Sequence, residues 1–175
     1  ERVLESGRDL MVLSVGALDE EFLSRLRDLA VRKGRRIYIP SGAVVGIDGI
    51  KAVSDKISEI ILITRKNPKS FGLNMNECKI IFEGSAKDAV RMYPQNVNVA
   101  ATISLAGVGL ERTKVKIIAD PNVKENIHEI RVVGDFGEIL TVAKNVKLNE
   151  RTSYLAALSA IRMLKDLENA VVIGT

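Results

Sequence analysis

The chain has no tryptophan, one cysteine and one histidine, and these absences already narrow its chemistry. The single Cys78 excludes an intramolecular disulfide, which fits a reducing cytoplasm. Because His128 is the only histidine, we do not expect a zinc site of His and Cys ligands, and we predict no metal. No run approaches about 18 uncharged apolar residues, so we expect no membrane-spanning helix.

Charge and length exclude further classes of protein. Lys and Arg number 26 against 22 Asp and Glu, and the basic residues are dispersed rather than clustered with aromatic residues, so nucleic acid is not an expected partner. The 175 residues, 46% of them hydrophobic, suffice for one good core or two small ones. The sequence opens at Glu1 without a signal peptide or an initiator Met, which is consistent with a processed product or a piece of a longer protein.

Phosphate-binding glycine motifs are also missing. Neither residues 42–46 (GAVVG) nor residues 107–109 (GVG) complete a G-x-G-x-x-G fingerprint, and no Walker A pattern occurs. A G-x-S-x-G nucleophile elbow is absent too, although counting residues alone leaves a Ser-His-Asp triad open. If the chain handles a dinucleotide, the pyrophosphate fingerprint does not lie in it.

The hydrophobic pattern changes along the chain. Residues 9–16, 19–33 and 36–40 are typical of a strand, a helix and a strand, which together predict a βαβ unit. Later segments predict a strand-rich part with inserted helices, and the chain ends in a predicted helix (151–167) and a short strand (170–173). The predicted fold class is α/β plus α+β, with a parallel domain followed by a mixed sheet. The predicted strands of this second part cover residues 58–66, 79–83, 113–119, 126–133 and 138–146.

The central stretch 94–109 combines asparagines, small apolar residues and two glycines. Asn98 is a good helix N-cap, and the uncharged residues that follow it predict a helix buried on all sides. The positive end of such a helix can hold an anion or a polar ligand. The same pattern also fits a well-capped core helix without a ligand, and this stretch alone does not separate the two interpretations.

His128 lies in the predicted strand 126–133, where alternation places it on one face with Ile130 and Val132. A histidine on an apolar face needs a hydrogen-bond partner or a cleft. Both a structural and a catalytic role remain open on spacing alone.

Six motifs in order make the chain resemble one known family. They are residues 39–43 (IPSGA), 82–86 (FEGSA), 96–102 (NVNVAAT), 105–107 (LAG), 126–129 (NIHE) and 152–160 (TSYLAALSA). Along nearly its whole length the sequence is similar to L-aspartate dehydrogenase of the pyridine-nucleotide biosynthesis type, in its archaeal form. The set of six, more than any one of them, carries the resemblance.

The resemblance implies a two-part architecture. Residues 1–45 would be the remaining, C-terminal part of a Rossmann NAD(P)-binding domain, and residues 46–150 a mixed-sheet catalytic and dimerisation domain with helices packed on its sheet. Residues 151–175 would form a helix and a short strand that return towards the Rossmann domain. Family members begin earlier, with the first Rossmann strand and its glycine-rich turn, so we expect weak or no NAD binding by this chain alone.

The resemblance also implies an activity and its residues. The family oxidises L-aspartate with NAD or NADP to iminoaspartate, which enters quinolinate synthesis or hydrolyses to oxaloacetate and ammonia. The active-site histidine falls on His128, and the nicotinamide-cofactor contacts fall on Ala43 and Asn98. We expect a cytoplasmic homodimer. Donors for the substrate carboxylates stay open among Ser41, Thr102, Ser104, the backbone N–H groups of residues 99–101, and an Arg or Lys near the cleft.

Two alternatives remain at this point. A relative with the same two-domain plan, such as dihydrodipicolinate reductase or homoserine dehydrogenase, would act on a different substrate. A dimerising or binding domain without activity of its own would use the mixed sheet as an assembly surface.

Overall fold

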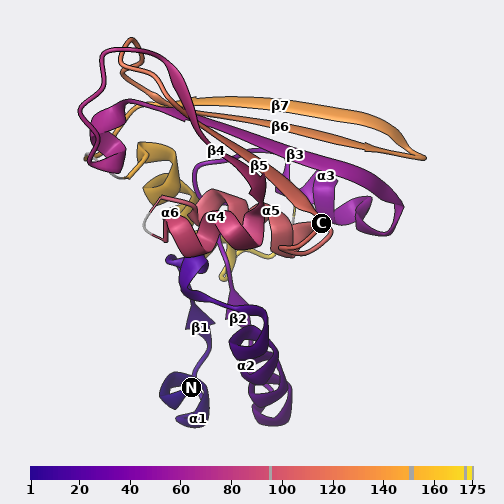
Figure 1. Cartoon of the computed structure of the whole chain (residues 1–175). Helices are drawn as coiled ribbons and strands as arrows, with labels where there is room; N and C mark the ends of the chain where they lie inside the picture. Colours follow the sequence, from indigo (N-terminus) through magenta and orange to yellow (C-terminus); the bar gives the residue numbers. More distant parts are fainter. Residues whose placement is uncertain (95, 150–151, 172, 175) are drawn as a thin grey trace.

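The computed structural model describes residues 1–94, 96–149, 152–171 and 173–174. Figure 1 shows a broad sheet with helices beneath it and, below the helices, a smaller unit formed by the N-terminal part of the chain. No helix in the described ranges is long and apolar enough to cross a membrane.

The N-terminal unit contains the predicted βαβ arrangement. After the short α1 (Arg2–Glu5) come β1 (Leu10–Met11), the 3-10 turn η1 (Val15–Ala17), α2 (Glu20–Lys33) and β2 (Ile37–Tyr38). Strands β1 and β2 pair in parallel, as predicted, but each is only two residues long. Helix α2 begins where the Asp19 side chain accepts a bond from the Phe22 N–H (2.7 Å) and ends at the left-handed Gly34.

The second part of the chain forms a five-stranded mixed sheet, which confirms that prediction. Its order is β4-β5-β3-β6-β7, with β3 paired in parallel to β5 and all other neighbours antiparallel. Buried and more exposed side chains alternate along the central strand β3, and Ile60, Leu62 and Thr64 share its buried face. The strands are β3 (Ile57–Lys66), β4 (Lys79–Ser85), β5 (Thr113–Ala119), β6 (Asn126–Gly134) and β7 (Gly137–Asn145).

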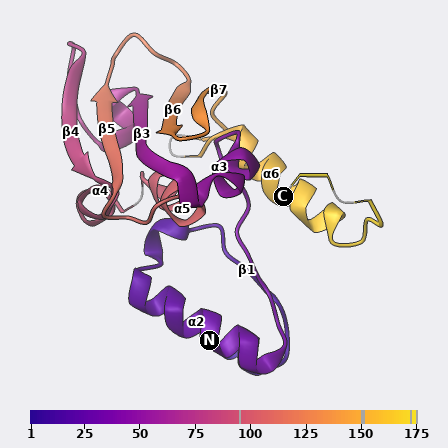
Figure 2. The ribbon, with the colours of Figure 1, turned by 90° about the vertical axis from the view of Figure 1, so that its right-hand side faces the viewer.

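Helices α4 and α5 lie between the sheet and the N-terminal unit and cover one face of the sheet, while α6 extends to the side (Figure 2). The central helix α5 is uncharged, and its residues from Ala100 to Ser104 are buried, as its composition predicts. The opposite face of the sheet carries ion pairs, such as Lys114 with Glu59, beside the exposed Leu140 and Val142. The remaining helical segments are α3 (Ile47–Ala52), η2 (Ser54–Lys56), η3 (Pro68–Phe71), α4 (Ala86–Met92), α5 (Asn98–Ala106) and α6 (Tyr154–Asp166).

Two predictions, the N-cap of α5 and the strand at the C-terminus, are wrong. Asn98 is the first helical residue of α5 and not its cap, because Val97 occupies the cap position and no side chain caps the helix. The closing strand at 170–173 does not form among its described residues, of which Val171 and Ile173 are largely exposed and have no neighbouring strand to pair with. Val172 lies outside the described residues, as does Arg151, at which the predicted last helix began.

Candidate functional site

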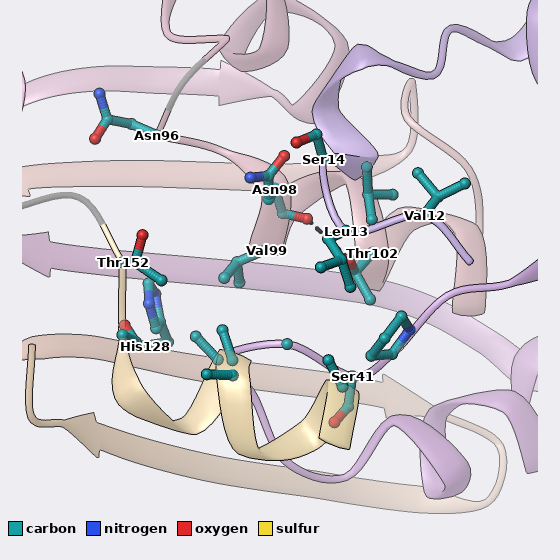
Figure 3. A pocket seen from close by; sticks show the side chains of 18 of the residues that line it. Val12, Leu13, Ser14, Ser41, Asn96, Asn98, Val99, Thr102, His128 and Thr152 are labelled. Carbon is teal, nitrogen blue, oxygen red and sulfur yellow. Dashed lines mark hydrogen bonds between the residues drawn. The ribbon is translucent and has the colours of Figure 1, made fainter. Parts of the chain in front are cut away.

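A cleft of about 380 Å³ lies where the N-terminal unit, the sheet and α6 meet. Its size falls within the range of about 300–1,000 Å³ that is usual for small-molecule sites. The cleft brings together Ala43, Asn98 and His128, the three residues singled out from the sequence (Figure 3 shows Asn98 and His128). They come from a loop after β2, the start of α5 and the first half of β6, respectively.

Ala43 lies in a turn that is held from two sides. The side-chain amide of Asn145, at the end of β7, donates to the Ala43 carbonyl (2.9 Å), and the Ser159 hydroxyl of α6 accepts a bond from the Gly42 N–H (3.1 Å). Gly42 has a φ of +69°, a left-handed conformation that other residues rarely adopt. The turn therefore depends on a glycine and on two contacts from the far part of the sequence.

We expect Asn145→Ala to loosen this turn. Asn145 is 5% exposed, and its loss leaves the buried Ala43 carbonyl without its donor, so the free energy of unfolding should fall by about 1–3 kcal/mol. Urea unfolding measures the change. Asn74→Ala, at an exposed position outside any helix or strand, is the control, and an equal loss in both variants would contradict the assignment.

Asn98 joins the N-terminal unit to α5. Its Oδ1 accepts a hydrogen bond from the Gly16 N–H in η1 (2.8 Å) across 82 residues of sequence. The amide oxygen that was predicted to cap its own helix is thus used by another segment. Within the described part of the chain Nδ2 has no hydrogen-bond partner, which leaves a donor for a ligand in the cleft.

His128 is almost completely buried, at 1% exposure, and it lines the cleft from β6. Its Nδ1 lies 3.1 Å from the Thr64 hydroxyl of the neighbouring strand β3. When Nδ1 carries the hydrogen and donates it to Thr64, the other ring nitrogen, Nε2, is free to accept a proton. Burial, helped by the nearby Lys66 ammonium, lowers the pKa of His128 to about 3, so the ring is neutral at neutral pH.

This low pKa makes folding sensitive to acid. An unfolded histidine has a pKa near 6.5, so between pH 6.5 and 3 the unfolded chain holds a proton that the folded chain lacks, and stability falls as the pH falls. We expect His128→Gln to remove a slope of up to about 1.4 kcal/mol per pH unit between pH 5 and 6.5, where carboxylates titrate little. Urea unfolding at several pH values measures it. Parallel curves for wild type and variant would contradict the buried neutral state.

Lys66 is a residue of this cleft that was not identified individually from the sequence. It ends β3, lines the cleft and is 5% exposed. Its ammonium donates to the Asn96 backbone carbonyl (3.3 Å) and lies 6.0 Å from the centre of the Phe71 ring. The signal was present, because the period of two along β3 places Lys66 on the buried face with Leu62 and Thr64.

The hydroxyl candidates for ligand binding divide into two groups. Ser41 and Thr102 line the cleft, although the Thr102 hydroxyl donates to the Asn98 carbonyl of its own helix (2.9 Å). Ser104 does not line the cleft and is a wrong candidate, because it is buried inside α5 and donates to the Ala100 carbonyl (2.8 Å). Of the backbone N–H groups at 99–101, that of Ala101 is used by the Val97 carbonyl, and only Val99 of the three residues lines the cleft.

Metal ligands do not gather at this site. No group of three or more His, Cys, Asp or Glu side chains in the described part of the chain could hold a metal ion. The described residues that line the cleft include no acidic side chain.

Comparisons with known proteins agree on one family. A family profile described as "Aspartate dehydrogenase, C-terminal" matches residues 48–167. The chain is 50% identical to L-aspartate dehydrogenase of Methanosarcina barkeri, covering 99% of this chain and 70% of that protein. It is 48% identical to the L-aspartate dehydrogenase of Archaeoglobus fulgidus, covering 99% of this chain and 72% of that protein.

A solved structure extends the likeness to the fold. The crystal structure of aspartate dehydrogenase from Thermotoga maritima superposes with a TM-score of 0.84 at 32% identity, over 99% of this chain and 71% of that one. The profile, the sequence relatives and the structural neighbour therefore agree, and the chain belongs to the aspartate dehydrogenase family.

Proposed function

We propose that this protein oxidises L-aspartate at its α-carbon, with NAD or NADP as the acceptor. The product, iminoaspartate, hydrolyses to oxaloacetate and ammonia or enters quinolinate synthesis. The observation that carries the proposal is the single cleft that collects Ala43, Asn98 and His128 from three distant parts of the sequence. Membership of the family supports the reaction and implies a pyridine-nucleotide cofactor.

The residues at one side of the cleft fit the nicotinamide end of such a cofactor. The small Ala43, 7% exposed, and the neighbouring Gly42 let a flat ring approach the backbone. The free Nδ2 of Asn98 suits the oxygen of a carboxamide or a ribose hydroxyl. We therefore assign Ala43 and Asn98 to cofactor binding; the bound cofactor supplies the hydride acceptor.

His128 is proposed as the proton acceptor. Loss of hydride from the α-carbon forms a C=N bond with the electron pair of the amine, so the substrate ammonium must first give up a proton. Nε2 of the neutral imidazole can take that proton while Thr64 holds Nδ1. After that proton has passed to solvent, the neutral ring can orient and deprotonate the water that attacks the C=N carbon.

We also propose the domain division and the assembly. The parallel β1–α2–β2 unit supports residues 1–45 as part of a Rossmann domain, and residues 46–150 would be the catalytic and dimerisation domain. The contact of Ser159 with Gly42 supports the return of residues 151–175 to the first unit. The uncovered sheet face, with the exposed Leu140 and Val142, supports a homodimer, and we expect it in the cytoplasm.

The test is the reaction of the intact enzyme with L-aspartate and either NAD or NADP, followed by the absorbance of the reduced nicotinamide. L-aspartate should support reduction of at least one cofactor, with oxaloacetate and ammonia as products. D-aspartate, L-homoserine and dihydrodipicolinate (with reduced cofactor) form the control panel. Turnover of a panel member in preference to L-aspartate would overturn the proposal in favour of that activity.

A further inference from the structure

The ammonium of Lys66 is a buried positive charge for which the described part of the chain supplies no carboxylate partner. Among the described residues no carboxylate lies within 4.0 Å of it, and its only hydrogen-bond acceptor is the Asn96 carbonyl. The Phe71 ring adds a weak attraction for a cation at 6.0 Å. Transfer of an ammonium from water to such a place is unfavourable unless a counter-charge is supplied.

The surroundings of Lys66 increase this imbalance. Lys147 donates to the Ser70 hydroxyl (3.2 Å) and adds a second positive charge near Lys66, while the described lining of the cleft contains no acidic side chain. Burial and, to a lesser extent, Lys147 lower the pKa of Lys66 to about 8, which still leaves it mostly protonated at neutral pH. A negative group that enters the cleft would therefore meet an ammonium that is already desolvated.

The position of Lys66 matches the place for the substrate. It lies two residues beyond Thr64 on the same face of β3, and Thr64 contacts His128. In Figure 3 His128, Thr152 and Asn96, whose carbonyl accepts from Lys66, lie towards one end of the cleft. Val12, Leu13 and Ser41 lie towards the other end, beside the β1–β2 unit. A cofactor at the β1–β2 end thus leaves the Lys66 end for the substrate.

We propose that Lys66 binds a carboxylate of the dicarboxylate substrate and so anchors it beside His128. This inference rests on the proposed function and adds a substrate-binding residue to it. The ammonium gains its missing counter-ion only when substrate is bound, which makes the interaction favourable for ligand affinity and unfavourable for the empty protein.

Two opposite changes are expected from Lys66→Met in the intact enzyme. The KM for L-aspartate should rise by about 10- to 150-fold, the range for loss of a hydrogen bond between charged groups. The unliganded protein should melt at a higher temperature, because an unpaired buried charge is replaced by an apolar chain of similar length. A lysine with a purely structural role would show the reverse, with lower stability and an unchanged KM.

A binding measurement separates this proposal from the activity. Succinate, an unreactive dicarboxylate, should bind the wild type in calorimetry and bind Lys66→Met at least about 10-fold more weakly. Lys66→Arg keeps the charge and should retain part of the affinity. Lys147→Met is the matched control, since it removes a nearby charge that does not line the cleft, and its effect should be several-fold smaller.

The outcomes are separable. Equal losses of succinate affinity in Lys66→Met and Lys147→Met would contradict a direct contact with Lys66 and favour a general effect of positive charge. An unchanged KM and an unchanged succinate affinity in Lys66→Met would overturn the proposal. In both cases wild-type turnover of L-aspartate would leave the proposed function standing. L-asparagine, which lacks the side-chain carboxylate, shows which carboxylate Lys66 binds. If Lys66→Met weakens binding of L-aspartate alone, Lys66 binds the side-chain carboxylate; if it weakens binding of both amino acids, Lys66 binds the α-carboxylate.

Discussion

His128→Ala is expected to lower kcat for L-aspartate oxidation by about 100- to 10,000-fold, the usual contribution of a general acid or base. His128 is the only imidazole in the chain, so no second histidine can replace it as proton acceptor. The cofactor contacts proposed for Ala43 and Asn98 come from other elements, and cofactor affinity should therefore change little. Steady-state kinetics and calorimetry with the cofactor measure the two quantities.

The controls for this experiment address folding. His128→Gln keeps much of the side-chain volume and should show the same loss of kcat, while Ile130→Val, on the same buried face of β6, should leave kcat near the wild-type value. Circular dichroism checks that each variant is folded. Wild-type turnover in folded His128→Gln and His128→Ala would refute the assignment of the proton acceptor.

Gly134→Ala is expected to lower the free energy of unfolding by about 3 kcal/mol, the upper end of the usual cost of overpacking. A Cβ at this position would lie 2.0 Å from the backbone carbonyl oxygen of Lys56 and 2.7 Å from the ring of Phe136. The Phe136 ring can turn away, but the Lys56 carbonyl immediately precedes the central strand β3 and cannot move without displacing it. Urea unfolding measures the change.

Gly137→Ala is the matched control, because it tests a glycine of the same hairpin without the collision. Gly137 has a φ of +111°, yet a Cβ there would meet nothing within 4 Å. Gly137→Ala therefore adds only backbone strain, which should lower the free energy of unfolding by about 1–3 kcal/mol. A loss in Gly134→Ala no larger than in Gly137→Ala would show that β3 and β6 can separate at this point with little penalty.

Local patterns were enough to predict most of the elements. The alternation along β6 placed His128 on the buried face, and the helix predicted at 19–33 matches α2, because each of these patterns depends on residues a few positions apart. The parallel pairing of β1 and β2 followed from the strand, helix and strand order. These parts of the fold are encoded within single segments.

Contacts between distant segments could not be predicted in this way. Asn98 carries the pattern of a helix cap, but the Gly16 N–H competes for its side-chain oxygen from 82 residues away, and no local pattern reports that competition. The bond from Asn145 to the Ala43 carbonyl spans 102 residues and is equally hidden. Lys66 is a different case. Its burial could be predicted from the period of β3, but that no described residue supplies a counter-ion is seen only when the cleft is assembled.

The proximity of Lys66 to His128 connects substrate binding to proton transfer. Burial is the main cause of the low pKa of His128, and the positive charge of Lys66 adds to it; a bound carboxylate would offset this second contribution. The ring would then become a stronger base when the substrate is present than when the cleft is empty. In the empty site His128 thus stays unprotonated, and its pKa rises when the substrate binds.

The three bonds that hold Gly16, Gly42 and Ala43 all cross the same boundary, between the N-terminal unit and the rest of the molecule. The cleft lies on that boundary, so a ligand within it touches both sides at once. Occupancy therefore acts as a removable cross-link: the amides of β1, α2 and β2 should exchange with solvent through local opening in the empty protein and share the slower exchange of the sheet when the cleft is filled. The N-terminal unit and the sheet should therefore unfold as one cooperative unit only when a ligand is bound.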